Sequence, residues 1–160
     1  MMIDPQWLAI ARPLVGLHEI HGAEHAPEIL DMWRAIKRSG IQSDEVPWCA
    51  AFVGACLERA GIKSSRFESA ASYLTWGVRL SSPAHGCIVI FSREGGGHVG
   101  FVVGQDEGGR LLVLGGNQGD QVSVKAFPVT RVTGYRWPVD VPIPSWPLQI
   151  GSAATSESEA

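Results

Sequence analysis

The chain of 160 residues is long enough for one domain with a sizeable hydrophobic core. A hydrophobic share of 45%, a charged share of 18% and a net charge of −3 describe an ordinary soluble globular protein. Because no strong charge of either sign is present, composition argues against nucleic acid and anionic membranes as partners.

The N-terminal residues predict no signal peptide, because Asp4 precedes a short apolar run and no basic region is present. No apolar run reaches the roughly 18 residues of a membrane-spanning helix. We therefore expect synthesis in the cytoplasm, without a signal peptide or a membrane span. The three cysteines are an odd number. Cys49 and Cys56 would stand too far apart along one helix for a disulfide, which favours free thiols.

Apolar residues recurring at helical spacing predict four helices in the first half of the chain. They span residues 5–17, 27–38, 47–61 and 69–76. Pro13 interrupts the first, Pro27 suits the start of the second, and Ser69 and Gly77 suit the ends of the fourth.

A turn-rich segment between the first two helices carries several side chains of metal-binding types: His18, His21, His25, Glu19, Glu24 and Glu28. Glycine and proline stand where a rigid, ligand-bearing helix would be needed. The segment therefore predicts a solvated loop, and we expect neither a metal site nor another cofactor.

The predicted helix at residues 47–61, PWCAAFVGACLERAG, carries Cys49 in its first turn. Ser43 or Asp44 can cap it, Pro47 suits the first turn and Gly61 suits the C-terminal stop. A thiol at a helix N-terminus is favoured as a thiolate, and the N–H groups there can hold an oxyanion. The alternative is that Cys49 is only a small buried apolar residue.

From residue 81 onward, short runs of β-branched and aromatic residues separated by turn signals predict five strands in hairpin order. The strands span residues 87–91, 98–103, 111–115, 121–127 and 131–137. Helices followed by an antiparallel sheet indicate an α+β domain, assigned to residues 1–140. The tail, residues 141–160, is proline-rich and then small and polar, and we expect disorder after about Leu148.

Two polar residues on the predicted sheet could complete a site with Cys49. His98 shares a strand face with Gly100, which leaves room for a neighbour, and it could accept the thiol proton. Asn117, in the turn GGNQ, could fix the tautomer of the imidazole. Taken alone, the histidine is usually a surface residue and the asparagine a turn residue. The order Cys, His, Asn is more informative than any one of them.

Several motifs together resemble those of small cysteine hydrolases of the NlpC/P60 and CHAP superfamily, and within it the phage- and effector-associated cell-wall hydrolases. The motifs are PWCAAFVGACLERAG, SAASYLTWG, PAHGCIVIF, GHVGFVVG, LGGNQGDQVSV and GYRWP, with GLHEIHG near the N-terminus. The resemblance implies a papain-like α+β fold, with N-terminal helices packed on a five-stranded antiparallel sheet.

The resemblance also implies cleavage of an amide bond in peptidoglycan through a thioacyl intermediate, as an endopeptidase or an N-acetylmuramoyl-L-alanine amidase. Cys49 would be the nucleophile, His98 the base and Asn117 the orienting residue, and Trp48 and Glu19 would line the substrate groove. Such proteins usually carry aspartate where this chain has Cys87, a difference expected to affect local packing more than catalysis.

Two other functions stay open: a peptidoglycan-binding module without catalysis, and an acyltransferase that uses the same triad. A lysin would be released with the help of a phage holin, and an antibacterial toxin would be injected by secretion machinery and paired with an immunity protein. In either case peptidoglycan is the expected partner, and the periplasm or cell wall is the expected site of action.

Overall fold

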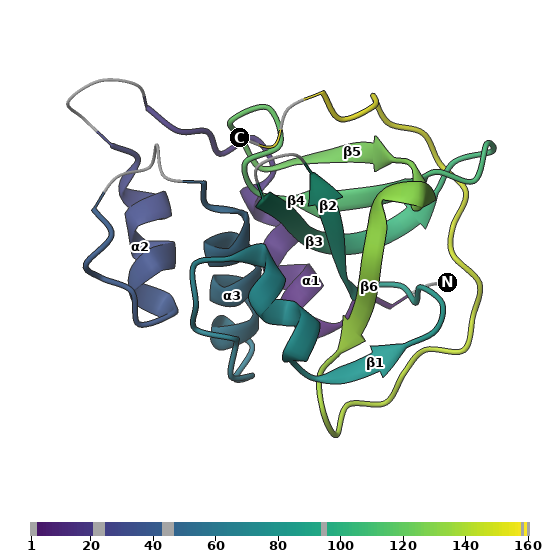
Figure 1. Cartoon of the computed structure of the whole chain (residues 1–160), viewed down its shortest axis with the longest axis horizontal. Helices are drawn as coiled ribbons and strands as arrows, with labels where there is room; N and C mark the ends of the chain where they lie inside the picture. The colour runs from purple at the N-terminus through teal and green to yellow at the C-terminus, as the bar shows by residue number, and fades with distance from the viewer. Residues whose placement is uncertain (1–2, 21–24, 43–46, 94–95, 158, 160) are drawn as a thin grey trace.

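The computed structural model describes residues 3–20, 25–42, 47–93, 96–157 and 159. In the described residues the helices gather beside a six-stranded antiparallel sheet, with α3 between α2 and the sheet and η2 packed directly on the sheet (Figure 1). This arrangement confirms the predicted α+β class. No helix in the described part of the chain is both long and apolar enough to cross a membrane.

The helices lie where apolar spacing places them but are shorter than predicted. They are α1 (Gln6–Ala11), η1 (Arg12–Leu14), α2 (Pro27–Ala35), α3 (Cys49–Arg59), η2 (Ala70–Thr75) and η3 (Val129–Arg131). Pro13 falls in η1, where the first predicted helix tightens into a 3-10 turn. The residue at the N-cap of α3 is Trp48. The predicted capping residues, Ser43 and Asp44, lie outside the described residues.

The sheet has six strands, so the prediction of five was wrong. The strands are β1 (Val78–Leu80), β2 (Ile88–Arg93), β3 (Gly96–Gln105), β4 (Leu111–Gly115), β5 (Ser123–Phe127) and β6 (Val132–Trp137). Their order is β1-β6-β2-β3-β4-β5, so the chain returns from β5 to place β6 beside β2. The missed strand, β1, has three residues that pair with β6, too few to show an alternating pattern.

Helix α3 is the centre of the core. Every residue from Cys49 to Leu57 is buried, because α1 and α2 cover one side of the helix and β3 covers the other. The sequence predicts a one-sided apolar stripe, whereas small residues at positions 50, 51, 54 and 55 let the neighbours approach all round. Across the interface with the sheet, the rings of Phe52 and Phe101 meet edge to face at 6.1 Å.

The C-terminal tail runs back along the sheet toward the end at which β3 begins (Figure 1). The amide of Gln105 donates to the carbonyl of Gln149 at 2.8 Å, and that of Gly151 donates to Gln105 at 2.9 Å. Further on, Ala126 of β5 donates to Ala154 and accepts from Ser156. The described residues of the tail therefore pair with the sheet through their backbone. Composition does not reveal it, because backbone pairing needs no apolar side chains.

Candidate active site

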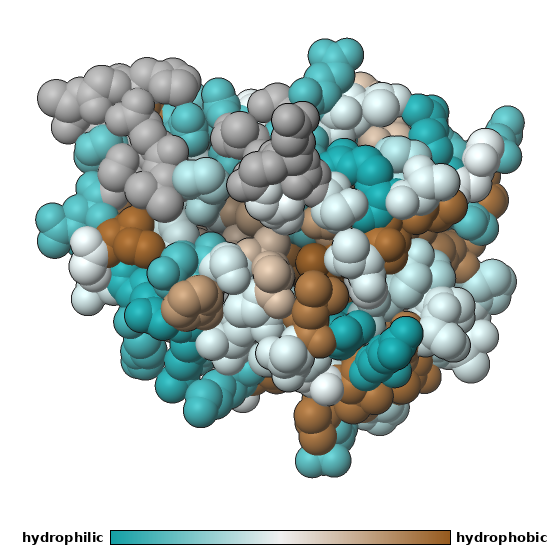
Figure 2. All heavy atoms as spheres, viewed as in Figure 1, coloured by the Kyte–Doolittle hydropathy of each residue, from teal (hydrophilic) through white to brown (hydrophobic). Residues whose placement is uncertain are grey.

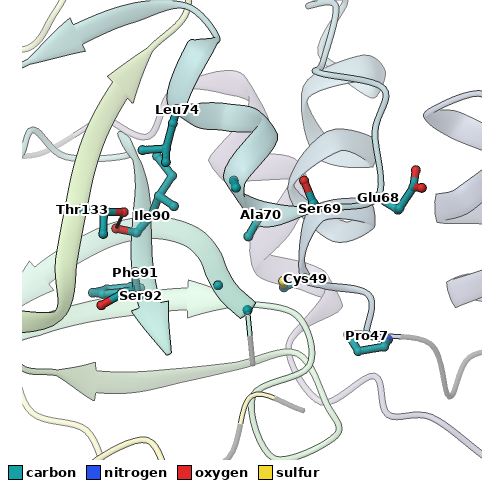
Figure 3. Close-up of a pocket in the computed structure, with 13 residues that line it drawn as sticks. Pro47, Cys49, Glu68, Ser69, Ala70, Leu74, Ile90, Phe91, Ser92 and Thr133 are labelled. Carbon is teal, nitrogen blue, oxygen red and sulfur yellow. Dashed lines mark hydrogen bonds between the residues drawn. The ribbon is translucent and has the colours of Figure 1, made fainter. Parts of the chain in front are cut away.

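Cys49 is the first residue of α3, and its side chain borders a cavity of about 400 Å³. The cavity is lined by small and apolar residues of η2, β2 and β3, among them Ala70, Leu74, Ile90 and Gly97. Figure 3 shows the sulfur at the start of its helix, with Ala70 on one side of the opening and Phe91 across it. Apolar side chains gather near the middle of this face of the molecule, where the helices meet the sheet (Figure 2).

The other two cysteines are core residues. Cys56 and Cys87 are fully buried, and burial raises the pKa of each thiol to about 12. A thiolate is therefore strongly disfavoured at both positions. Cys49 is the cysteine that the cavity reaches.

His98 lies on β3, opposite Phe91 of β2, and immediately follows Gly97, which lines the same cavity as Cys49. Its imidazole is fully buried and stacks against two aromatic rings, with centroids 5.5 Å from Phe127 and 6.3 Å from Phe91. These contacts fix the plane of the imidazole. Cys49 borders the cavity from the helix, and the neighbour of His98 on β3, Gly97, borders it from the sheet.

A glutamine holds the imidazole. Nε2 of His98 lies 2.9 Å from Oε1 of Gln118. Nε2 of Gln118 donates to the carbonyls of Ser123 at 2.9 Å and Val113 at 3.2 Å, so the opposite end of the amide must be its acceptor oxygen. His98 therefore donates from Nε2 and keeps a lone pair on Nδ1. A neutral imidazole in this tautomer can take a proton through Nδ1.

The predicted orienting residue, Asn117, has another partner: its Nδ2 donates to the backbone carbonyl of Glu159 at 2.9 Å. Asn117 has a left-handed backbone, with φ of 62°. Gln118, the next residue, is the one whose amide turns back to the carbonyl of Val113 on β4 and to His98. The motif GGNQ contains two adjacent amides, and the sequence offered no signal to choose between them.

The two glycines of this motif allow the close contacts around the amide. A Cβ on Gly115 would lie 2.3 Å from Oε1 of Gln118 and 3.4 Å from Nε2 of His98. A Cβ on Gly116 would lie 2.7 Å from the Trp48 ring. The end of β4 therefore fits between the His98–Gln118 pair and the start of α3 only because Gly115 and Gly116 have no side chains.

Trp48 and Glu19 are brought together, as a pair that supports the start of α3. Nε1 of Trp48 donates to Oε2 of Glu19 at 3.0 Å, and both residues are buried. Neither lines the cavity at Cys49. The structure therefore places these two residues beneath the candidate site, whereas the sequence analysis expected them in the substrate groove.

Within the described residues, no group of three or more histidine, cysteine or acidic side chains is arranged to hold a metal ion. Of the histidine-rich segment, His18 lies with Nδ1 at 3.2 Å from the carbonyl of Gly16. His21 and Glu24 lie outside the described residues.

The comparisons with known proteins agree with this geometry. A search of curated proteins found no match. The family model of the CHAP domain matches residues 41–117, a stretch that contains both Cys49 and His98. This match is consistent with a CHAP-type cysteine hydrolase, and the α+β fold with its antiparallel sheet is consistent with the papain-like architecture that the motifs predicted.

Proposed function

We propose that this protein is a peptidoglycan hydrolase in which Cys49 is the nucleophile, His98 the general base and Gln118 the residue that orients the base. CHAP domains are generally amidases or endopeptidases of this kind. The observation that carries the proposal is the contact that orients His98: Gln118 accepts from its Nε2 at 2.9 Å, and Gly97, the neighbour of His98 on β3, lines the cavity that Cys49 borders. Asn117, first predicted as the orienting residue, has no place in this scheme.

The reaction begins with proton transfer from the Cys49 thiol to Nδ1 of His98. The thiolate attacks the carbonyl carbon of an amide bond, and N–H groups of the first turn of α3, including that of Cys49, stabilise the oxyanion. His98 then protonates the leaving amine. In the second half of the reaction His98 activates water, which releases the acyl group from sulfur as a carboxylate.

The bond cut is an amide of the stem peptide or the amide that joins the peptide to the glycan. The cavity suits a peptide with small side chains, because Ala70, Ala71, Gly96 and Gly97 form much of its wall. Either a phage holin or secretion machinery would deliver the enzyme to the periplasm or cell wall, and an injected toxin would require an immunity protein.

Removal of the nucleophile tests the proposal. The variant Cys49→Ala should lower the release of soluble fragments from purified peptidoglycan by about a thousandfold or more, the scale of loss seen when a nucleophile is removed. The matched control is Cys56→Ala, which removes a thiol from the same helix at a position that the cavity does not reach. Circular dichroism should show that both variants fold.

The same assay separates the alternatives. Undiminished hydrolysis by Cys49→Ala would reject the thioacyl scheme. A binding module would sediment with peptidoglycan without releasing fragments from it. An acyltransferase would release products whose mass includes the acceptor in place of water.

A further inference from the structure

Glu159 ends the described part of the tail, and it is fixed beside the candidate active site by three contacts. Its carboxylate pairs with Nη2 of Arg131 at 2.6 Å and accepts a hydrogen bond from the hydroxyl of Ser156 at 2.7 Å. Its backbone carbonyl accepts from Nδ2 of Asn117 at 2.9 Å. Only 7% of Glu159 is exposed. A polar tail residue this buried, with both its backbone and its side chain engaged, occupies a site that can hold an acidic residue.

The partners of Glu159 adjoin the catalytic base on two sides. Asn117 directly precedes Gln118, which holds Nε2 of His98. The guanidinium of Arg131 lies 5.4 Å from the ring centroid of Phe127, and that ring stacks on His98. Burial alone would raise the pKa of Glu159, but hydrogen bonds from Arg131 and Ser156 lower it instead. Glu159 is therefore an anion next to the imidazole.

The rest of the tail is held weakly. No apolar side chain among the described residues after Pro138 is fully buried, and Ile143, Trp146 and Ile150 are exposed. Between residues 149 and 156 the tail makes four backbone hydrogen bonds, to Gln105 and Ala126, and the hydroxyl of Thr155 accepts from Arg110. Segments with little apolar burial open at low free-energy cost. We call the described residues 149–157 and 159 the C-terminal strap, and we call the contacts of Glu159 its latch.

The side chains proposed to react are both buried in this structure, since His98 is 0% exposed and Cys49 is 4% exposed. A polymer substrate needs a groove that continues on both sides of the thiol. The cavity lined by Ala70 and Gly97 supplies one side. Near His98, Asn117 donates to a peptide carbonyl, as it would to a substrate backbone, but the carbonyl belongs to Glu159 of the strap.

We propose that Asn117 and Arg131 form a subsite for an acidic residue of a peptide, and that Glu159 occupies this subsite in cis so that the C-terminal strap inhibits the enzyme. The proposal rests on the proposed function, since it assumes that Cys49 and His98 are the reacting pair. Displacement of the strap by a peptide that carries a carboxylate would open the site.

Two full-length variants test the latch. Glu159→Ala removes the carboxylate, and Glu157→Ala removes an equal charge from an exposed position two residues earlier. Near neutral pH, iodoacetamide should alkylate Cys49 about tenfold faster in Glu159→Ala than in the unmodified chain. Loss of one charge-assisted hydrogen bond changes the equilibrium between the closed and the open strap by about this factor. The rate in Glu157→Ala should not change. Hydrogen exchange at the amides of Gly151 and Ser156 should accelerate only in Glu159→Ala.

A synthetic peptide with the sequence of residues 149–159 should bind the Glu159→Ala chain, as measured by fluorescence anisotropy, and slow the alkylation of Cys49. A peptide with Glu159→Gln should bind about tenfold more weakly, whereas a peptide with Glu157→Gln should bind as the parent does. Slower or unchanged alkylation in Glu159→Ala would overturn the proposal, as would equal binding of the three peptides. If Glu159→Ala does not fold, Ser156→Ala, which removes one latch contact, gives the same test.

These readouts do not depend on hydrolysis. Alkylation and peptide binding that follow the predicted order, in a protein that releases nothing from peptidoglycan, would support the subsite and reject the proposed function. Hydrolysis that requires Cys49 but does not respond to Glu159→Ala would support the function and reject the strap.

Discussion

The side-chain amide of Gln118 has several hydrogen-bond partners, and two of them are backbone carbonyls that accept from its nitrogen. The amide cannot rotate by half a turn without facing its oxygen toward those carbonyls, which would cost buried hydrogen bonds. The proton on Nε2 of His98 is thus set by the backbone of β4 and of the residue that opens β5. The fold itself selects the tautomer of the base.

Replacement of the glutamine tests this role. Gln118→Leu should lower kcat for peptidoglycan hydrolysis by about a hundredfold or more, as expected for loss of the group that sets the tautomer of a base. It should also slow the alkylation of Cys49 by iodoacetamide near neutral pH, because the thiolate would lose a correctly oriented imidazole. Asn117→Gly, which keeps the left-handed turn, should lose far less kcat. The opposite ranking of the two variants would return the orienting role to Asn117.

At this scale the sequence identified candidates but could not place their contacts. Cys49 and His98 could be singled out as candidates, because each carries a reactive group near the start of an element, within a recognisable motif. Which of Asn117 and Gln118 contacts His98 depends on the left-handed backbone of Asn117. The motif alone does not indicate which of the two adjacent side-chain amides points toward the imidazole. Glu159 gave no signal at all, since its partner Arg131 is distant in sequence and a polar tail is typical of disorder.

Among the helices, α2 and α3 pack closely enough that a glycine is required between them. A Cβ at Gly54 would lie 2.5 Å from Cγ2 of Ile36 and 3.2 Å from the hydroxyl of Tyr73. Both neighbours are fully buried, so neither can move away freely. The nucleophile-bearing helix is therefore held by steric contacts on the side away from the sheet.

Gly54→Ala should lower the free energy of unfolding by about 1–2 kcal/mol, because overpacking outweighs the roughly 1 kcal/mol that alanine contributes to helix propensity. Gly40→Ala is the control, since no atom lies within 4 Å of a Cβ at that position. It should change stability by less than about 0.5 kcal/mol. Urea unfolding at pH 7 measures both. A stabilised Gly54→Ala would show that α2 and α3 are less closely packed than described.

Elements with strong local signals were the predictable ones. Proline and glycine at the ends, with apolar residues at helical spacing, placed α2 and α3 to within a few residues. Strand β1 and the position of β6 beside β2 depend on pairing between distant segments, which no local pattern records. The burial of α3 on all sides has the same origin, because it depends on which elements surround the helix.

For the molecule as a whole, the partly buried ion pair of Glu58 and Arg66 should contribute to the response to acid. Glu58, near the end of α3, accepts hydrogen bonds from Arg66 at 2.9 and 3.0 Å and from the amide and hydroxyl of Ser64 at 2.9 and 2.8 Å. The hydrogen bonds from Arg66 are the main cause that lowers the pKa of Glu58 to about 2. A carboxyl whose pKa is lower in the folded state stabilises the protein above its unfolded pKa and loses that contribution as the pH falls.

Thermal unfolding between pH 7 and pH 2 should show this linkage. Glu58→Gln should be less stable at pH 7 by about 1–2 kcal/mol, a figure reduced for solvent screening because the Arg66 side chain is 36% exposed. The difference should shrink as the pH falls below about 4.5 and become small near pH 2. The control, Glu107→Gln, alters an exposed residue of the loop after β3 and should follow the parent. A difference that persisted at pH 2 would contradict the assignment.

The strap has a second effect, on the rim of the sheet. Strand β5 is the last strand on its side, and the strap supplies the hydrogen-bond partners of Ala126 there. Once the strap is displaced, the amide and carbonyl of Ala126 become a template on which a strand of another molecule can add. Activation would then promote self-association, so the opened enzyme should sediment as larger species at high concentration and as single chains on dilution.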